Sequence, residues 1–200
     1  MNKEKRKNRY DFHSMSYVTM YYNFHQGMLI SLAQAYEKKL KDAGFSQGKI
    51  LDAGCAFGGL SMHLVNAFPL IECIGVDFSQ NQIDFASQLA KEAPGGERIT
   101  FVKADVHHLP FEDNSFDAVF NLNVAHIVDD PVQMFNEFER VLKPEGVLFI
   151  KDLRKTLFGS AEEEIRYSFT AEEARELISQ SKLRKGKFST SSLWWNYEII

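Results

Sequence analysis

The chain has 200 residues, of which 44% are hydrophobic and 25% charged, and it carries a formal net charge of −4. This length and composition are typical of one globular domain with its own core. The negative charge argues against nucleic acid as the main partner, because neutralising phosphates requires Lys and Arg in quantity.

The first ten residues form a basic segment. Its basic side chains are Lys3, Lys5, Arg6, Lys7 and Arg9. We interpret it as a solvated tail; a nucleic-acid-binding arm is the alternative, which no nearby motif supports. No apolar stretch follows as in a secretory signal, and no apolar run approaches the roughly 18 residues of a membrane helix. Because two cysteines, Cys55 and Cys73, cannot form a disulfide framework, we expect a cytoplasmic protein without a membrane partner.

The amino-terminal half of the chain predicts a long helix and then alternating strands and helices. Apolar residues at helical spacing predict a helix over 14–43, with a break at Gly27 as an option. Three strands are expected next, at Lys49–Ala53, Ile71–Val76 and Ile99–Lys103. Two helices are expected between them, one over Gly58–Ala67 and one from the cap Ser79 to Glu92.

The carboxyl-terminal half continues this alternation. Further strands are expected at Phe116–Phe120 and Val147–Lys151. Between them, Asp130 as N-cap and Pro131 at the first helical position begin a helix that runs to Leu142. A turn at Pro144–Gly146, a capping box at Thr170–Glu173 and paired strands over 186–200 complete the pattern.

Apolar strands that alternate with helices predict an α/β fold. The expected architecture is a doubly wound, mostly parallel sheet with helices on both faces. We expect a single domain over residues 1–200, with a tail and helical cap at 1–47 and the core at 48–200. Such sheets bind ligands beyond the carboxyl ends of their strands.

Acidic residues lie at the ends of three successive predicted strands. Asp52 precedes a Gly-rich turn whose small residues allow close approach of a ligand. Asp77 lies 23 residues after Gly54, where a carboxylate can accept both hydroxyls of a ribose. Asp105 ends the third strand and could read the polar edge of an adenine. Three carboxylates at one edge of a sheet indicate a ligand with hydroxyls or positive charge.

The same turn distinguishes between two candidate cofactors, a nicotinamide dinucleotide and S-adenosylmethionine. A nicotinamide dinucleotide would place its pyrophosphate at the Gly-rich turn, where Asp52 at ~5 Å repels it by roughly 3 kcal/mol. Ala56 also stands where the dinucleotide fingerprint has Gly. S-adenosylmethionine has no phosphate and carries an ammonium and a sulfonium, which suit a carboxylate-rich edge.

Four segments carry a family resemblance. They are LDAGCAFGG at 51–59, GVDFS at 75–79, KADVHHLPFEDNSFDAVF at 103–120 and RVLKPEGVLFI at 140–150. In this order and at these spacings, the chain from about residue 48 to 152 resembles the class I S-adenosylmethionine-dependent methyltransferases of small molecules. The resemblance implies a three-layer, Rossmann-like core with strand order 3-2-1-4-5-7-6 and an antiparallel seventh strand.

The resemblance also implies cofactor-binding positions. The methionine part would lie against Asp52, Ala53, Gly54 and Cys55. The adenosine part would lie against Asp77 at the ribose, Phe78 and Gln82 at the adenine face, and Asp105 and Val106 at the adenine amino edge. Asn121 would lie near the methionine ammonium, and S-adenosylhomocysteine would be the product. Ala56 departs from the usual Gly, and we expect it to shift the turn slightly.

The acceptor side offers His126 as a candidate catalytic residue. It follows the fourth strand and could deprotonate a hydroxyl or amine; a histidine packed under the helix at Pro131 is the alternative. His107 and His108 are interpreted as loop residues, because a metal site would need further ligands. Aromatic residues before the first strand suggest a helical lid over the site, and they include Tyr10, Phe12, Tyr17, Tyr21 and Tyr22.

These observations rank three functions. The leading hypothesis is methyl transfer from S-adenosylmethionine to a small-molecule acceptor. In methylases of adenine or amide nitrogens, two prolines and an aromatic residue follow the position of Asn121. Here Leu122, Asn123 and Val124 follow it, which argues against a nucleic-acid or glutamine substrate. A cofactor-binding protein without transferase activity is a second hypothesis, and a nicotinamide-dependent oxidoreductase a third.

Overall fold

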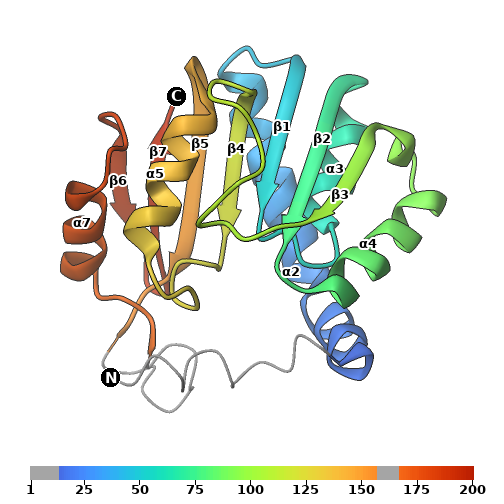
Figure 1. Cartoon of the computed structure of the whole chain (residues 1–200), viewed down its shortest axis with the longest axis horizontal. Coiled ribbons are helices and arrows are strands. Elements are labelled where there is room, and N and C mark those ends of the chain that lie inside the picture. The colour runs from blue at the N-terminus through green and yellow to red at the C-terminus, as the bar shows by residue number, and fades with distance from the viewer. Residues whose placement is uncertain (1–13, 157–166) are drawn as a thin grey trace.

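A computed structural model describes residues 14–156 and 167–200 of the chain (Figure 1). The basic segment and two of the proposed lid residues, Tyr10 and Phe12, lie outside the described residues. Within the described part, no helix has both the length and the apolar character needed to cross a membrane.

The described residues form a seven-stranded sheet of order β3-β2-β1-β4-β5-β7-β6, which confirms the expected strand order. Its strands are β1 (Gln47–Ala53), β2 (Leu70–Asp77), β3 (Ile99–Lys103), β4 (Phe116–Leu122), β5 (Leu142–Leu153), β6 (Lys187–Thr190) and β7 (Trp194–Ile199). The pairs among β1 to β5 are parallel, whereas β7 runs antiparallel to both of its neighbours.

Helices cover both faces of this sheet, as a doubly wound fold requires. They are α2 (Met15–Asp42), α3 (Gly59–Ala67), α4 (Gln80–Glu92), α5 (Pro131–Val141) and α7 (Ala171–Gln180), with a short 3-10 turn η1 (Gly96–Arg98). Figure 1 shows α5 and α7 in front of the sheet and α2 behind it. Successive strand residues point to opposite faces, so each face has its own apolar core.

The two cores explain why the strands read as continuous apolar runs. On the front face, Leu51 and Val119 pack in one cluster with Phe135 of α5. On the back face, Ile50 packs in a second cluster with Tyr36 of α2. Because both faces are buried, the strands lack the polar alternation of a half-exposed sheet.

The predicted helix caps are confirmed. The Ser79 hydroxyl accepts from the Gln82 amide at 3.3 Å and begins α4. The Asp130 carboxylate accepts from the Gln133 amide at 3.0 Å, with Pro131 in the first turn of α5. Thr170 and Glu173 form the expected capping box of α7. These signals act within one helical turn, so the sequence reveals them directly.

Two elements differ from the expectation. The helix α2 runs unbroken through Gly27, because an interior Gly weakens a helix by about 1 kcal/mol without ending it. The strand β5 begins before the predicted turn at Pro144–Gly146. Leu142 already pairs with Phe116, and the intervening residues form a bulge, a place where a strand tolerates proline.

The carboxyl ends of the parallel strands meet at one end of the sheet, the lower end in Figure 1. The first turns of α2, drawn in deep blue, extend past the same end. The carboxyl terminus lies at the opposite end, as the antiparallel direction of β7 requires. Loops that follow β1 to β5 therefore converge beside the amino-terminal half of α2.

Candidate cofactor and acceptor site

The loop after β1 is pinned to the end of β2. The backbone amides of Gly54 and Cys55 both donate to the Val76 carbonyl, at 2.8 and 2.9 Å. Gly54 has φ +82°, and a Cβ there would lie 2.3 Å from Cγ2 of Val124. Only glycine satisfies both constraints, so the loop passes close to the end of β4 in a conformation that a larger residue would disrupt.

Asp77 connects this loop to the start of α4. Its Oδ2 accepts from the Ala56 amide at 3.1 Å, and its Oδ1 accepts from the Ser79 amide at 2.9 Å. Burial raises the pKa of the Asp77 carboxyl, and the backbone amides oppose that rise. A carboxylate offers about four acceptor positions, so both oxygens retain capacity for the hydroxyls of a ribose.

Asp52 is buried behind the loop. Its side chain is 4% exposed, and Oδ2 accepts from the Ser61 hydroxyl of α3 at 2.7 Å. Burial raises the pKa of Asp52 to about 6, and the nearby Asp77 charge adds to the effect. The prediction placed Asp52 against the methionine part; in this structure its hydrogen bond holds α3 against the strand end.

Asp105 follows β3 at the edge of the site. Its Oδ1 accepts from the His107 amide at 2.9 Å and pairs with His107 Nδ1 at 2.6 Å. Partial burial opposes ionisation, but the hydrogen bonds from His107 hold the pKa of Asp105 below its ordinary value. The neighbouring Val106 is buried beneath the loop. Asp105 thus presents a half-exposed, ionised carboxylate where the resemblance places the adenine amino edge.

His107 joins two loops, a role that its position in the sequence did not predict. Its Nε2 accepts from the Asp130 amide at 3.3 Å while Nδ1 faces Asp105. A neutral ring protonated at Nδ1 satisfies both contacts. His107 therefore connects the end of β3 to the start of α5.

Asn121 joins the ends of β4 and β1. Its side chain is fully buried, and Nδ2 donates to the Ala53 carbonyl at 2.8 Å. Its Oδ1 is buried without a hydrogen-bond partner among the described residues. An unsatisfied buried acceptor is costly and uncommon, so this oxygen suits a donor such as an ammonium.

Phe78 and Gln82, predicted together at the adenine face, have different environments. The Phe78 ring is half exposed at the rim, whereas Gln82 is buried, with an Oε1 that has no partner in the described structure. Phe78 is placed to stack on a flat ligand. Like Oδ1 of Asn121, the buried Oε1 of Gln82 is an unsatisfied acceptor.

His126 is buried as half of a histidine–carboxylate pair. Its Nδ1 lies 2.6 Å from Oδ1 of Asp152, and its backbone amide donates to the other Asp152 oxygen at 3.3 Å. The two side chains are 4% and 0% exposed. His126 is thus packed, as the alternative interpretation expected, but against a carboxylate of β5. Sequence reasoning missed Asp152, because only strand pairing brings it beside the end of β4.

Aromatic residues of α2 lie against the loop after β1. The Tyr22 ring centroid is 5.0 Å from that of Phe57 and 5.5 Å from that of Phe85. Tyr21 lies 6.2 Å from Phe57 and also 6.2 Å from Tyr17. The amino-terminal half of α2 is therefore seated on the loop that carries Gly54.

The residues at this end fit S-adenosylmethionine better than a metal or a dinucleotide. Asp77 and Asp105 offer acceptors for hydroxyl and amino groups, and the unpartnered Oδ1 of Asn121 suits an ammonium. Within residues 14–156 and 167–200, no group of three or more His, Cys, Asp or Glu side chains could hold a metal ion.

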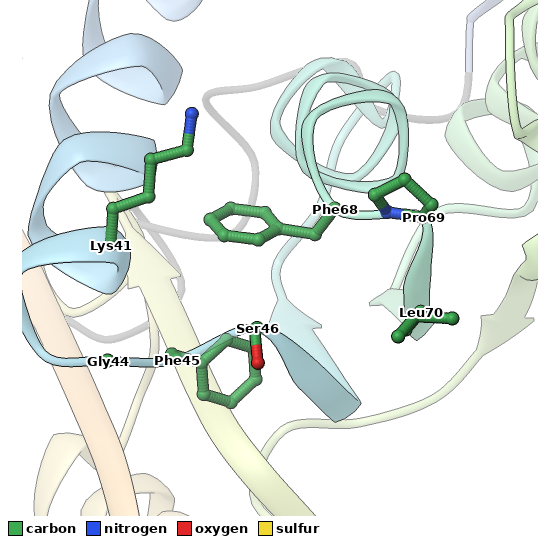
Figure 2. Close-up of a pocket in the computed structure, with 7 residues that line it drawn as sticks. All are labelled: Lys41, Gly44, Phe45, Ser46, Phe68, Pro69 and Leu70. Atoms are coloured by element: carbon green, nitrogen blue, oxygen red, sulfur yellow. The ribbon is translucent and has the colours of Figure 1, made fainter.

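A hollow lies at the opposite end of the sheet (Figure 2). It is lined by Lys41, Gly44, Phe45, Ser46, Phe68, Pro69 and Leu70. These residues precede β1 and β2, so they are far from the carboxyl ends of the strands. The lining is mainly apolar and contains none of the predicted site residues.

Comparisons with known proteins agree with this geometry. Residues 51–150 match the profile of the methyltransferase domain family. Cycloartenol-C-24-methyltransferase 1 of Oryza sativa subsp. japonica is 38% identical over 96 residues, which are 48% of this chain and 28% of the relative. Tocopherol O-methyltransferase of Arabidopsis thaliana is 34% identical over 114 residues, which are 57% of this chain and 30% of the relative.

The match to these relatives therefore spans less than a third of their length. A solved structure described as a SAM-dependent methyltransferase from Aquifex aeolicus superposes with a TM-score of 0.68 at 18% identity, covering 99% of this chain and 97% of that one. This likeness shows the shared fold. Together with the profile match over half of the chain, it confirms the class expected from the motifs: the chain belongs to the methyltransferase domain family as a class I member whose cofactor is S-adenosylmethionine.

Proposed function

We propose that this chain transfers the methyl group of S-adenosylmethionine to a small, lipid-like acceptor. The observation that carries the proposal is Asp77, whose two oxygens are fixed by backbone amides from the loop after β1 and from the start of α4. In this proposal, the carboxylate held in this way accepts the hydroxyl groups of the ribose.

The remaining cofactor contacts follow from the same edge. Asp105 and Val106 would hold the adenine edge and Phe78 one adenine face. The loop from Asp52 through Ala53 and Gly54 to Cys55, with Asn121, would hold the methionine part. When bound, the cofactor supplies an electrophilic methyl group on a sulfonium. The residues of the chain hold it and exclude water, because methyl transfer depends mainly on placing the acceptor ~3–3.5 Å from that carbon.

We assign the acceptor side to the His126–Asp152 pair and the aromatic residues of α2. Asp152 holds the His126 ring in one orientation through Nδ1, as carboxylates do for catalytic histidines. In this proposal His126 takes the proton that a hydroxyl or amine acceptor loses. Tyr21, Tyr22 and Phe57 form an apolar wall that would shield the reacting atoms from water.

A lipid-like acceptor is supported by two observations. The wall of the proposed acceptor side is aromatic. The names of the two relatives, for cycloartenol and for tocopherol, refer to water-insoluble alcohols.

The proposal is tested with methyl-labelled S-adenosylmethionine and a panel of sterols, prenylated phenols and fatty acids. We expect label in at least one lipid product, and binding of S-adenosylhomocysteine by calorimetry. Binding without transfer to the panel or to a cell lipid extract would favour a cofactor-binding protein instead. Binding of NAD in place of S-adenosylhomocysteine would overturn the assignment altogether.

A further inference from the structure

The outer face of α2 combines exposure with a lack of charge. Residues 14–36 contain no Asp, Glu, Lys or Arg, although this stretch covers more than five turns of a helix on the surface. Exposed helix faces ordinarily carry charged residues. An uncharged, exposed face of this length indicates a surface that also contacts something other than water.

Large apolar side chains form a line along this face. Met20, Phe24 and Met28 follow one another at intervals of four residues, so they lie on one side of the helix. Their side chains are 57%, 83% and 40% exposed. We call Met20, Phe24 and Met28 the α2 ridge. Its neighbours on the exposed face, Ser16, Asn23, Gly27 and Ser31, are small and uncharged.

The ridge cannot turn inward, because the opposite side of the helix is already occupied. Val18 is fully buried there, and Tyr22 packs on Phe57 and Phe85. The first turns of α2 also lie at the end of the sheet where the cofactor loop lies (Figure 1). The ridge therefore faces outward on the helix that begins at the end of the sheet where the proposed site lies.

The basic residues of the chain are concentrated before α2. The first nine residues contain five basic side chains and one acidic side chain, Glu4, and they precede α2 in the chain by five residues, whereas the whole chain has a net charge of −4. A basic segment joined to an uncharged helix with an apolar ridge is the pattern of a helix that lies in the surface of an anionic bilayer. Basic residues near such a surface add electrostatic attraction to anionic headgroups.

We propose that the α2 ridge docks the protein on the surface of anionic lipid membranes, with α2 lying in the headgroup region. This proposal replaces the expectation of no membrane partner, which rested on the lack of a membrane-spanning segment. The inference extends the proposed function, because a lipid-like acceptor would reach the site from that surface. Its test measures binding to vesicles and needs no acceptor or cofactor, so either proposal can fail without the other.

The test is flotation of the full chain with vesicles of phosphatidylcholine, alone or with added phosphatidylglycerol. We expect the wild type to float with the anionic vesicles and less with the neutral ones. The variant Phe24→Glu/Met28→Glu should bind the anionic vesicles at least about tenfold more weakly, because it places two charges in the docking face. The matched control Leu70→Glu/Ile200→Glu alters two exposed apolar residues at the other end of the sheet and should bind like the wild type.

Three results would overturn the proposal. The wild type could fail to float with anionic vesicles, or the ridge variant could float as well as the control. The wild type could also remain unbound to vesicles but form a dimer that the ridge variant dissociates, which would make the ridge an interface between copies of this chain. Thermal melts verify that the variants are folded; if the ridge variant melts early, Phe24→Asn replaces it under the same criteria.

Discussion

At the scale of single residues, the most specific prediction is that Asp77 contributes to cofactor binding. Replacing it with Ala removes the acceptors for a ribose and frees the Ala56 amide from its contact. Because hydrogen bonds to charged groups contribute ~1.5–3 kcal/mol, we expect S-adenosylhomocysteine binding to weaken by roughly 2–4 kcal/mol in calorimetry. Asp84→Ala, at an exposed position of α4, is the control and should leave the affinity unchanged. Equal affinities for both variants would exclude Asp77 from the site.

Ala56 stands where the family usually has glycine, and the structure shows the consequence. Its backbone has φ +47°, a left-handed conformation that costs a non-glycine residue roughly 1–2 kcal/mol. Ala56→Gly relieves this strain and adds about 0.4–1 kcal/mol of unfolded-state entropy. We expect unchanged or slightly higher thermal stability and equal or tighter cofactor binding. A large loss of affinity would show that the Ala56 methyl group is itself a contact.

Asp52 predicts a pH dependence of stability. Its folded pKa of about 6 lies above the ordinary value of 3.8, so the folded state binds the proton more tightly than the unfolded chain. Ionised, buried Asp52 therefore lowers stability above pH 6, and that cost diminishes as the pH falls from 6 toward 4.

The isosteric variant Asp52→Asn lacks this titration and can still accept from Ser61. Between pH 7.5 and 4.5, we expect the wild type to gain roughly 2 kcal/mol of unfolding free energy relative to the variant. Urea unfolding of both proteins across that range measures the difference. Parallel pH profiles would show that Asp52 titrates normally in the fold.

The helix α2 gives the prediction at the scale of elements. Deleting residues 1–20 removes its first turns, including the buried Val18, but leaves the packing of Tyr36 on the sheet. We expect a folded protein with a lower melting temperature that loses methyl transfer more than cofactor binding, because lids complete a site and exclude water from it. A destabilised protein with full transfer activity per folded molecule would contradict the lid.

The whole molecule should respond to its cofactor product as a two-state domain does. S-adenosylhomocysteine at a hundred times its Kd adds about 2.7 kcal/mol to the unfolding free energy. For a domain of this size that corresponds to a rise in Tm of about 5–10 °C. NAD at the same concentration should leave the Tm unchanged. The reverse pattern in a thermal melt would restore the nicotinamide hypothesis.

Much of the fold could be predicted from the sequence because its signals are local. The caps at Ser79, Asp130 and Thr170 act within one helical turn, and the apolar strands between them reflect a sheet buried on both faces. Asp77 and Asp105 could be proposed as site residues, because the ends of parallel strands meet at one edge. Local patterns alone do not encode the strand order, which was predicted from the family motifs.

Contacts between distant segments decided the rest. Asp152 lies beside His126 only because β5 pairs with β4, and Gln82 is buried while Phe78 is exposed only because of how α4 packs. The φ of Ala56 depends on the pinning of its loop to Val76 and Asp77. Apolar strands that alternate with helices, together with the helix caps and the acidic residues at the strand ends, by themselves determined an α/β sheet with a carboxylate-rich edge. The partners of its buried polar groups required the tertiary structure, because a hydrogen bond across the sheet depends on register and packing that no short stretch of sequence specifies.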